Sequence, residues 1–553
     1  MKLIKGLLLI LLTISVCAFS VACTEEEAPP PEEKGGFGYK ASDDGTATIT
    51  NCTATHTKLV IPAEIDGYRV TAIADGAFFN YSAATELVIS DGITSIGKSA
   101  FEHCMSLKSV AIPASVKSLG EKAFNDCVKL EKIAIDGGSA LNFIGINAFS
   151  GCRALSTEEY GGAVYLPIGE SSHALLISAV SQSITEADIH PETEIIAGNA
   201  FSQCSAITKI TIPEKVRHIG DKAFYGCTNL DKIYFNAIMM DDLAQGSALF
   251  ERVATKSETM TLFIGNKVKR IPAYLMDSTS RLRSVKFADD TVCESIGAYA
   301  FAGTPLPDFT IPNSLKRIEP FAFANCQWLA DVKLDADDLG DLTADSDIFS
   351  GTGSKTAGVT LTIGREAKRV PAYFCDGFRS LAQVKFENSD VTSSFGANAF
   401  IDCDGIQRVL VTSRKGWCES TFENEYSNPI RYGNAVFYIE DTSVTEGLIL
   451  TKDITFISDY AFIGYKGLSK IVIPLTVQSI GKSAFSGVNN LYTIYWGGTE
   501  AEWNQLLIKE DNGILSKSTV YFYTENPPTS PGNYWCYGEE DIPKIWRNTA
   551  VGE

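Results

Sequence analysis

The chain has 553 residues, of which 45% are hydrophobic and 21% charged, so its composition is that of a folded protein rather than a disordered one. Lys and Arg total 47 against 67 Asp and Glu, which gives a net charge of −20. A balance this acidic repels nucleic acid and anionic membrane surfaces, so we expect no nucleic acid as a partner.

Residues 1–22 have the form of an export signal. Lys2 and Lys5 precede an apolar run that is too short for a typical membrane-spanning helix. The run ends in Ser-Val-Ala-Cys, which resembles a bacterial lipobox, although that motif usually has Leu where this chain has Ser20. The resemblance implies cleavage before Cys23, lipid attachment to its thiol and a membrane anchor. The alternative is cleavage after Ala22 and free secretion.

Residues 23–38 are acidic and rich in Pro and Gly, and they contain almost no residue that could be buried in a core. Such a composition predicts an extended tether. An Asp-Gly pair between alternating segments follows in residues 39–50, and it predicts a β-hairpin that caps the first repeat.

A short pattern centred on Ala-Phe recurs along the chain, with 23 residues between the clearest copies. A fixed period in the twenties is typical of a leucine-rich repeat solenoid, in which each unit forms one coil. We expect the recurring position to form an interior spine. Its members, degenerate copies included, are Phe78, Phe101, Phe124, Phe149, Phe201, Phe224, Phe250, Leu275, Phe301, Phe323, Phe349, Phe374, Phe400, Phe462 and Phe485.

Each unit also contains a short alternating segment. In residues 107–113, Val110 and Ile112 alternate with small residues, which predicts one short strand that ends at Pro113. A Gly such as Gly120 marks a tight bend before each Ala-Phe. Because no unit can bury its apolar face alone, the coils must stack on one another in a β-rich solenoid with parallel strands.

The units resemble the BspA-like leucine-rich repeats of bacterial surface proteins over residues 39–496. The residues that carry the resemblance in one unit are Ile112, Pro113, Val116, Gly120, Ala123, Phe124, Cys127, Leu130 and Ile133. The resemblance implies a right-handed superhelix that works by binding, for example in adhesion to host matrix proteins or to other bacteria.

A larger duplication underlies the degenerate units. Residues 261–276 align with residues 360–375 at an offset of 99, and four successive spine positions repeat with the same offset. We infer that a block of four coils was duplicated, which is expected if the coil is the structural unit.

Two stretches interrupt the period, at about residues 156–195 and 412–457. Both alternate apolar and polar residues around a polar turn, so we expect β-hairpins that bulge from the solenoid. Insertions on repeat arrays often gather on a binding face, but a tolerated surface loop would have the same pattern.

The last segment, residues 497–553, is aromatic and departs from the repeat. We expect a short amphipathic helix near its start and a cap that covers the open last coil, because an uncapped end exposes strand edges. The alternative is that Trp503, Trp535 and Tyr537 are exposed and bind sugar rings.

The cysteines follow the repeat rather than a disulfide pattern. Most occupy one slot, three residues after a spine Phe, where other coils have Thr or Val: Cys104, Cys127, Cys152, Cys204, Cys227, Cys326 and Cys403. A slot that accepts Thr and Val is a small buried site, so we expect free thiols. Disulfides between adjacent coils are the alternative.

No motif for catalysis or for a cofactor is present. Residues 334–347 resemble a calcium loop only in Asp337 and Gly340, since Leu339 and Ser346 stand at ligand positions, so we expect a solvated acidic loop. The five His residues form no zinc-binding spacing. We therefore expect neither a metal, nor a cofactor, nor enzymatic activity, although acids remote in sequence could still pair in space.

The outward positions of the predicted strands differ in charge from the rest of the chain. They contain eight basic and three acidic residues. The predicted binding face consists of Lys132, Lys209, Lys232, Tyr234, Lys286, Lys333, Lys385, Arg408, Lys470 and Tyr495. Such a face could dock acidic ligands, whereas Lys on an exposed sheet could equally serve only to keep it soluble.

The sequence therefore predicts a monomeric, lipid-anchored binding scaffold on a bacterial cell surface. We expect its partner to be an extracellular protein; an acidic glycan is the alternative ligand, and an enzyme is the third hypothesis.

Overall fold

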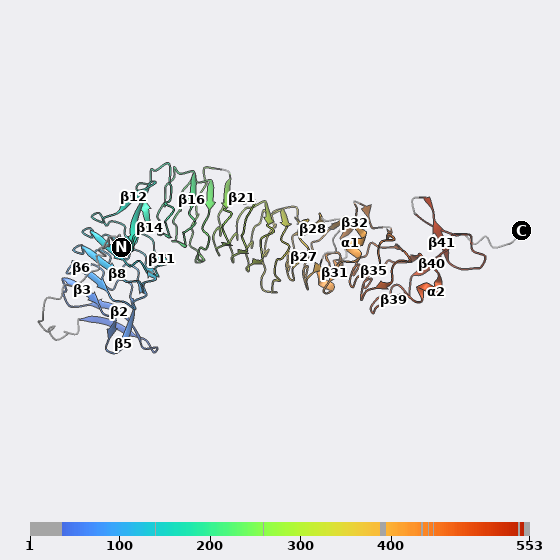
Figure 1. Cartoon of the computed structure of the whole chain (residues 1–553), viewed down its shortest axis with the longest axis horizontal. Coiled ribbons are helices and arrows are strands. Elements are labelled where there is room, and N and C mark those ends of the chain that lie inside the picture. The colour runs from blue at the N-terminus through green and yellow to red at the C-terminus, as the bar shows by residue number, and fades with distance from the viewer. Residues whose placement is uncertain are drawn as a thin grey trace, which may run out of the picture.

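The chain folds into a long solenoid of stacked β-coils that is bent towards its N-terminal end (Figure 1). The computed structural model describes residues 36–546, except residues 139, 258, 388–393, 433–434, 441, 446 and 540–541. The export signal, Cys23 and the tether up to residue 35 lie outside the described residues.

Except for the last strand of two sheets, the longer strands of successive coils pair in parallel, so that Ser109 lies opposite Lys132 and Val110 opposite Ile133. Each repeat position therefore meets its own counterpart in the next coil. These strands form four sheets: β3 (Lys58–Ile61), β6 (Glu86–Ile89), β8 (Ser109–Ile112) and β10 (Lys132–Ile135); β16 (Lys209–Ile212), β18 (Lys232–Phe235), β19 (Met260–Ile264) and β21 (Leu282–Phe287); β23 (Asp308–Ile311), β25 (Asp331–Leu334), β26 (Val359–Ile363), β28 (Leu381–Phe386), β30 (Arg408–Val411), β32 (Val436–Ile439) and β33 (Thr442–Ser443); and β34 (Leu448–Ile449), β36 (Lys470–Ile473), β38 (Thr493–Trp496), β40 (Thr519–Tyr523), β41 (Tyr534–Tyr537) and β42 (Pro543–Ile545).

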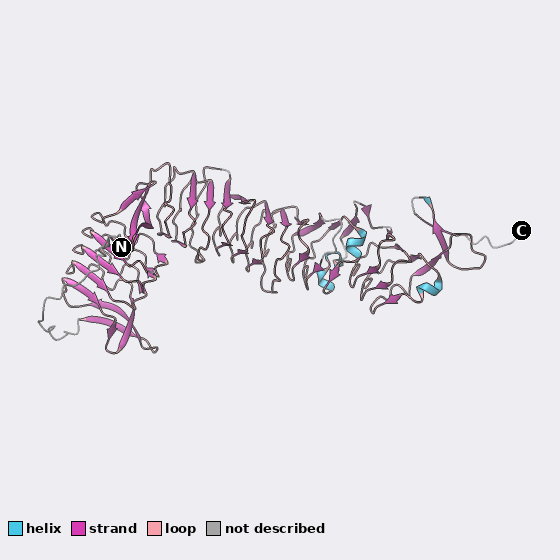
Figure 2. Ribbon diagram, in the orientation of Figure 1, coloured by secondary structure: helices cyan, strands magenta, loops and turns pink. Residues whose placement is uncertain are grey.

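Most coils have a second strand, usually of two residues, where we had expected only one strand per coil. This strand is too short for alternation to be visible in the sequence. Its ladders follow the solenoid beside the longer ones (Figure 2). The strands are β5 (Tyr68–Ile73), β7 (Ser95–Ile96), β9 (Ser118–Leu119), β11 (Phe143–Ile144), β15 (Ile195–Ile196), β17 (His218–Ile219), β20 (Arg270–Ile271), β22 (Ser295–Ile296), β24 (Arg317–Ile318), β27 (Arg369–Val370), β29 (Ser394–Phe395), β31 (Thr421–Phe422), β35 (Phe456–Ile457), β37 (Ser479–Ile480) and β39 (Leu507–Ile508).

An antiparallel hairpin begins the described chain. It consists of β1 (Phe37–Ala41) and β2 (Thr46–Cys52), and β2 pairs with β5, which also pairs with β4 (Glu64–Ile65). The Phe37 ring lies edge-on to Phe78, with 6.3 Å between ring centroids. The predicted tether, residues 23–38, therefore extends too far towards the C-terminus. Phe37 already belongs to β1 and packs against Phe78, the first spine residue.

All fifteen predicted spine side chains are buried. Within each run of regular coils their rings stack face to face, with 5.0 Å between the centroids of Phe78 and Phe101 and 5.2 Å between those of Phe101 and Phe124. The Phe124 N–H donates to the carbonyl of Ala148 in the next coil at 2.8 Å. Removing such a ring should cost about 3–5 kcal/mol, because the backbone ladder keeps the void open.

The stack changes residue in one coil. Phe349 stacks on Phe378, with 4.6 Å between centroids and 14° between ring planes, whereas Phe374 is perpendicular to Phe349. Phe374 is buried but lies beside the stack, and Phe378 continues it. Phe374 is therefore interior, as expected of a spine residue, but the ring that stacks on Phe349 is that of Phe378.

The Gly that precedes Ala-Phe in many of the coils lies where the coils approach each other closely, and its own dihedral angles do not require a Gly. A Cβ on Gly120 would lie 2.5 Å from the Lys98 nitrogen and 2.6 Å from the Gly97 carbonyl carbon of the preceding coil. The bend itself is made two residues later, where Lys122 has a φ of 56°. Ser99 and Asn199 have the same left-handed conformation in their coils, so our assignment of the bend to Gly is corrected.

The first insertion is a β-meander that interrupts the core. Its strands β12 (Glu158–Tyr160), β13 (Ala163–Ile168) and β14 (Ser171–Ala179) are antiparallel, and β14 continues in parallel into β15. Tyr165 packs in the C-terminal hydrophobic cluster and Leu166 in the N-terminal one. The insertion is thus a wall between two cores, not a bulge, and the solenoid bends at this point (Figure 1).

The second insertion contains a short antiparallel pair, β32 and β33, as expected, but it also contains helical turns that the sequence did not suggest. They are preceded by α1 (Arg414–Cys418) and two 3₁₀ turns (Glu425–Ser427 and Pro429–Arg431). Trp417 of α1 is buried against Phe422 and Phe437, so this segment contributes to the core.

The C-terminal segment closes the long-strand ladder. The helix α2 (Glu500–Trp503) is only four residues long, and β40, β41 and β42 extend the last sheet. Trp535 of β41 is fully buried, and its indole N–H donates to the carbonyl of Trp496 at 2.8 Å. No helix in the part of the chain that the structure describes is long and apolar enough to cross a membrane.

One buried histidine makes the fold sensitive to acid. His218 lies in β17, where other coils have Ser, with its ring edge-on to Phe143 and no hydrogen-bond partner for its buried Nε2. Burial and the nearby Arg217 lower the pKa of His218 from 6.5 to about 4. Unfolding therefore takes up a proton in this interval, so stability is retained above pH 6.5 and lost as the pH falls towards 4.

We predict that His218→Ser, which introduces the residue found in other coils, reduces this acid sensitivity. The free energy of unfolding of the wild type should fall by about 2–3 kcal/mol between pH 7 and pH 4 because of His218 alone. Urea unfolding at both pH values measures the difference. An equally steep acid dependence in the variant would contradict the assignment.

Candidate docking face

All ten residues of the predicted binding face lie on the long strands. Seven of the eight basic side chains are exposed, and Lys333 is half-buried. Tyr234 is half-buried and Tyr495 is buried. The ten residues therefore occupy equivalent positions on the long strands, but their side chains differ in how far they are exposed to solvent.

The strands β16, β18, β19 and β21 carry the strongest concentration of positive charge on this face. Lys209 lies opposite Lys232, and Tyr234 opposite Phe263, which in turn lies opposite Lys286. The rings of Tyr234 and Phe263 are stacked at 4.7 Å, and the Lys286 ammonium lies 5.9 Å from the Phe263 centroid. We call these five residues the basic patch.

No acidic side chain is among the eight outward residues of these four strands. Asp231, which precedes Lys232, approaches its ammonium only to 3.9 Å. Like charges directly opposite each other on neighbouring strands oppose sheet formation. The Lys209–Lys232 pair is therefore not explained by pairing within the sheet, whereas both ligand binding and solubility of the exposed sheet would account for it.

The face changes character in the next sheet. That sheet begins with Asp308 opposite Asp331, and Lys333 is paired with Asp335 at 3.3 Å and with Glu387 at 3.1 Å. A groove of 1210 Å³ runs over these strands, and among its described charged residues five are acidic and three basic: Asp289, Lys333, Asp335, Asp337, Arg365, Glu366, Lys385 and Glu387. The three acidic outward positions that the sequence contains are thus partly gathered here, and the basic residues of this sheet are less isolated than those of the basic patch.

Tyr495 is not available as a contact residue, contrary to our expectation. It stands at an outward position of β38, but the Trp535 ring of the cap packs against it, with 5.5 Å between centroids. Tyr521 of β40 lies opposite it in the sheet. Only 7% of Tyr495 is exposed, because the cap folds over this end of the face. The sequence alone could not show that a cap strand, residues 534–537, covers Tyr495.

The three aromatic residues proposed for sugar binding lie in three different environments. Trp535 is fully buried, so it cannot contact a sugar. Trp503 packs at 5.5 Å against Trp496. Tyr537 lines a pocket beside the second insertion. The cap interpretation therefore holds for Trp535, and Tyr537 remains as a residue for ligand contact.

The cysteine slot has a chemical role that the sequence did not reveal. The Cys127 thiol donates to the carbonyl of Phe101 in the preceding coil at 3.1 Å, and the Cys227 thiol donates to the carbonyl of Phe201 at the same distance. Thr352 occupies the slot in another coil and donates its hydroxyl to the equivalent carbonyl of Phe323 at 2.6 Å. The slot thus binds a backbone oxygen of the neighbouring coil.

These thiols are not reactive groups. All twelve described cysteines are free. A hydrogen bond with Cys104, together with burial, raises the pKa of Cys127 to about 12, and burial raises the pKa of Cys204 to about 11. A protonated thiol is neither a nucleophile nor a metal ligand. The slot cysteines thus form a ladder of mostly buried thiols along the described coils, and thiol titration of the denatured protein would test whether they are reduced.

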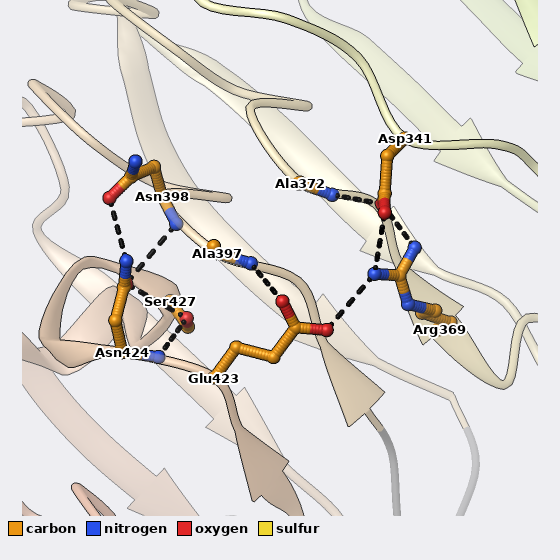
Figure 3. Close-up of polar contacts among 8 residues, drawn as sticks. All are labelled: Asp341, Arg369, Ala372, Ala397, Asn398, Glu423, Asn424 and Ser427. Carbon is orange, nitrogen blue, oxygen red and sulfur yellow. Dashed lines mark hydrogen bonds and ion pairs between the residues drawn. The ribbon is translucent and has the colours of Figure 1, made fainter.

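The acidic loop serves the fold instead of a metal. Arg369 binds Asp341 through both terminal guanidinium nitrogens and Glu423 at 3.1 Å, and each carboxylate also accepts a backbone N–H from another coil (Figure 3). In the duplicated block, Arg270 and Asp242 make the same pair at 2.5 Å. No group of three or more His, Cys, Asp or Glu residues able to hold a metal occurs among the described residues.

Two histidines meet on the first insertion. The rings of His173 and His190 are stacked at 4.1 Å, and the Glu192 N–H donates to His190 Nδ1 at 3.1 Å. Burial and the nearby His173 lower the pKa of His190. A backbone N–H that donates to Nδ1 requires the neutral tautomer of His190, which carries its proton on Nε2. Neither ring nitrogen of His190 then offers a lone pair to a metal.

The family of the chain follows from its repeats. Six copies of the BspA type leucine-rich repeat region match residues 51–165, 179–293, 246–356, 294–428 and 431–505, which together are most of the chain. The protein belongs to the BspA-type leucine-rich repeat family. The expected β-solenoid is thereby confirmed from both sequence and structure.

Solved structures of bacterial leucine-rich repeat proteins are similar to this BspA-type protein over most of its length. A leucine-rich repeat protein from Bacteroides ovatus is 21% identical, with 88% of this chain and 98% of that chain covered and a TM-score of 0.34. A leucine-rich cell surface protein from Faecalibacterium prausnitzii is 22% identical, with 87% and 98% covered and a TM-score of 0.25. No curated protein matches the chain.

We predict that the hydrogen bond from the cysteine slot stabilises the coil that contains Cys227. Cys227→Thr should keep the stability of the wild type, whereas Cys227→Val should lose about 1 kcal/mol, because the Phe201 carbonyl then keeps only the Cys204 N–H as a donor. Denaturant unfolding of the two variants measures the difference. Equal stability of both variants would show that the slot selects residues by size alone.

Proposed function

We propose that this protein is a binding scaffold on a bacterial cell surface and that its basic patch docks an acidic segment of an extracellular protein. The observation that carries the proposal is the patch itself: three Lys side chains and two stacked aromatic rings on four adjacent strands of a chain with a net charge of −20. Aromatic and basic residues together are typical of protein interfaces.

The stacked architecture supports a binding role. Outward residues of a solenoid can change without disturbing the core, so the same frame can present different surfaces. Lys209, Lys232 and Lys286 are exposed, and their separation is set by the spacing of neighbouring strands, about 4.8 Å. An extended acidic segment lying across the strands could pair with several of them at once.

The proposed location rests on the N-terminal residues. The export signal in residues 1–22 and the lipobox-like residues before Cys23 support a lipid anchor on the outer side of the membrane, with secretion as the alternative. An acidic tether would hold the solenoid away from the anionic lipid surface. Adhesion is the function that this arrangement serves best, and we propose a monomer.

Charge reversal of the patch tests the proposal. We predict that the triple variant Lys209→Glu, Lys232→Glu and Lys286→Glu binds a Glu-Tyr copolymer at least about tenfold more weakly than the wild type, since three exposed ion pairs contribute about 1.5 kcal/mol together. Fluorescence anisotropy at low and high salt measures this, and binding of the wild type should weaken with salt.

Lys470→Glu provides a matched control, because Lys470 is an exposed Lys at an outward position of a long strand, β36, that belongs to another sheet. It should bind like the wild type. Undiminished binding by the triple variant, or equal binding of a Lys-Tyr copolymer by the wild type, would refute the docking role of the patch.

A further inference from the structure

A groove lies beside the first insertion, at the bend of the solenoid (Figure 1). It has a volume of 640 Å³ and lies between the coil of Phe149 and the strands β13 and β14. Every residue of its lining falls within residues 147–199, all of which the structure describes, and Arg153 is the only charged one. We call it the insertion groove, and its lining is almost neutral.

One wall of the insertion groove carries backbone donors that lack acceptors. In the preceding coil, three N–H groups at alternate residues, the middle one that of Phe124, donate to the coil of Phe149 at 2.7–2.9 Å. The equivalent N–H groups of Asn147, Phe149 and Gly151 line the groove, and no described residue accepts a hydrogen bond from them. Two degenerate coils also lack these bonds, so the missing bonds alone define no site; here they border a groove.

The first insertion is the reason for the missing bonds. The N–H of Ala179, at the end of β14, donates to the carbonyl of Ala200 at 2.7 Å. This carbonyl is equivalent to that of Ala148, which accepts the N–H of Phe124 in the regular ladder. The end of β14 therefore takes the place that the coil of Phe149 would otherwise hold, and the donors of that coil border the insertion groove instead.

The first run of spine rings also ends at the insertion groove. Phe149 stacks on Phe124, with 5.9 Å between centroids, and no other aromatic ring of the described residues contacts it. Phe149 is 8% exposed, whereas Phe124 is fully buried. Val164, Ile177 and Val180 supply aliphatic surface on the insertion side of the groove. The groove thus places an apolar surface next to a row of hydrogen-bond donors.

We propose that the insertion groove binds an extended peptide segment that contains a small residue followed by an aromatic one. Carbonyls at alternate residues of the segment would accept the N–H groups of Asn147, Phe149 and Gly151, as the carbonyls of one coil do for its neighbour. The aromatic ring would stack on Phe149. Binding is then strand addition to an open edge of the solenoid.

The segment must come from another protein. The Ala-Phe pairs of this chain are buried in its own coils, so a second copy has none to offer. The nearly neutral lining favours an uncharged segment, whereas the basic patch favours an acidic one. The two surfaces share no residue, so this inference does not depend on the proposed function.

Hydrogen–deuterium exchange of the full mature chain tests the proposal with a capped peptide of residues 219–226. In the fold, carbonyls of this segment accept the equivalent N–H groups of the coil of Phe201, and its one Asp and one Lys leave it neutral. At about 1 mM peptide we expect the amides of residues 147–151 to exchange at least about tenfold more slowly. Residues 122–126, which are bonded already, should not change.

Substitutions on both partners separate the groove from unspecific binding. Ser178→Trp places a large side chain in the insertion groove and should abolish the protection, whereas Ser172→Trp, at an exposed position of the same strand outside the groove, should keep it. A peptide with Ala in place of Phe224 should bind at least about tenfold more weakly, because it has no ring to stack on Phe149.

Unchanged exchange of residues 147–151 in the wild type at saturating peptide overturns the proposal, whatever the fate of the variants. Undiminished protection in Ser178→Trp, or equal binding of the Ala peptide, also overturns it, and equal protection by about 10 mM sulfate overturns it in favour of an anion site. The triple charge-reversal variant of the basic patch should still bind the peptide, so the two proposals fail separately.

Discussion

The close approach of one coil's backbone to the next, at a column of glycines, is the constraint on which the rest of the structure depends. A Cβ on Gly120 or Gly220 would come within 2.5 Å of a backbone nitrogen of another coil. Real side chains do not tolerate such contacts, so the column sets the spacing at which the spine rings stack, the N–H groups reach across, and the cysteine thiols meet a neighbouring carbonyl. One spacing thus serves apolar and polar contacts together.

This constraint also determines where function can lie. Every inward position is committed to a contact with the next coil, so variation is confined to outward strand positions, to insertions and to the cap. The basic patch uses the first of these. The acidic composition of the rest of the chain makes the patch an exception in charge, and it favours selective encounter with anionic partners.

The periodic residues allowed the coils, the spine and the thiol slot to be predicted, because identical positions must meet in a stack. Features that depend on two strands or three segments meeting could not be predicted. The second strand has only two residues in most coils, and the ring stacked on Phe349 is Phe378 rather than the periodic Phe374. Tyr495 is outward by alternation yet buried, since only the fold brings Trp535 over it. The pocket beside Tyr537 likewise joins segments about a hundred residues apart.

The most direct test of the account compares two glycine substitutions by denaturant unfolding. Neither Gly120 nor Gly513 has a positive φ, but a Cβ on Gly513 meets no atom within 4 Å. We predict that Gly120→Ala loses at least about 3 kcal/mol through overpacking, whereas Gly513→Ala changes stability by less than about 1 kcal/mol. Equal stability of the two variants would contradict the claim that backbone contact at the glycine column sets the spacing of the coils.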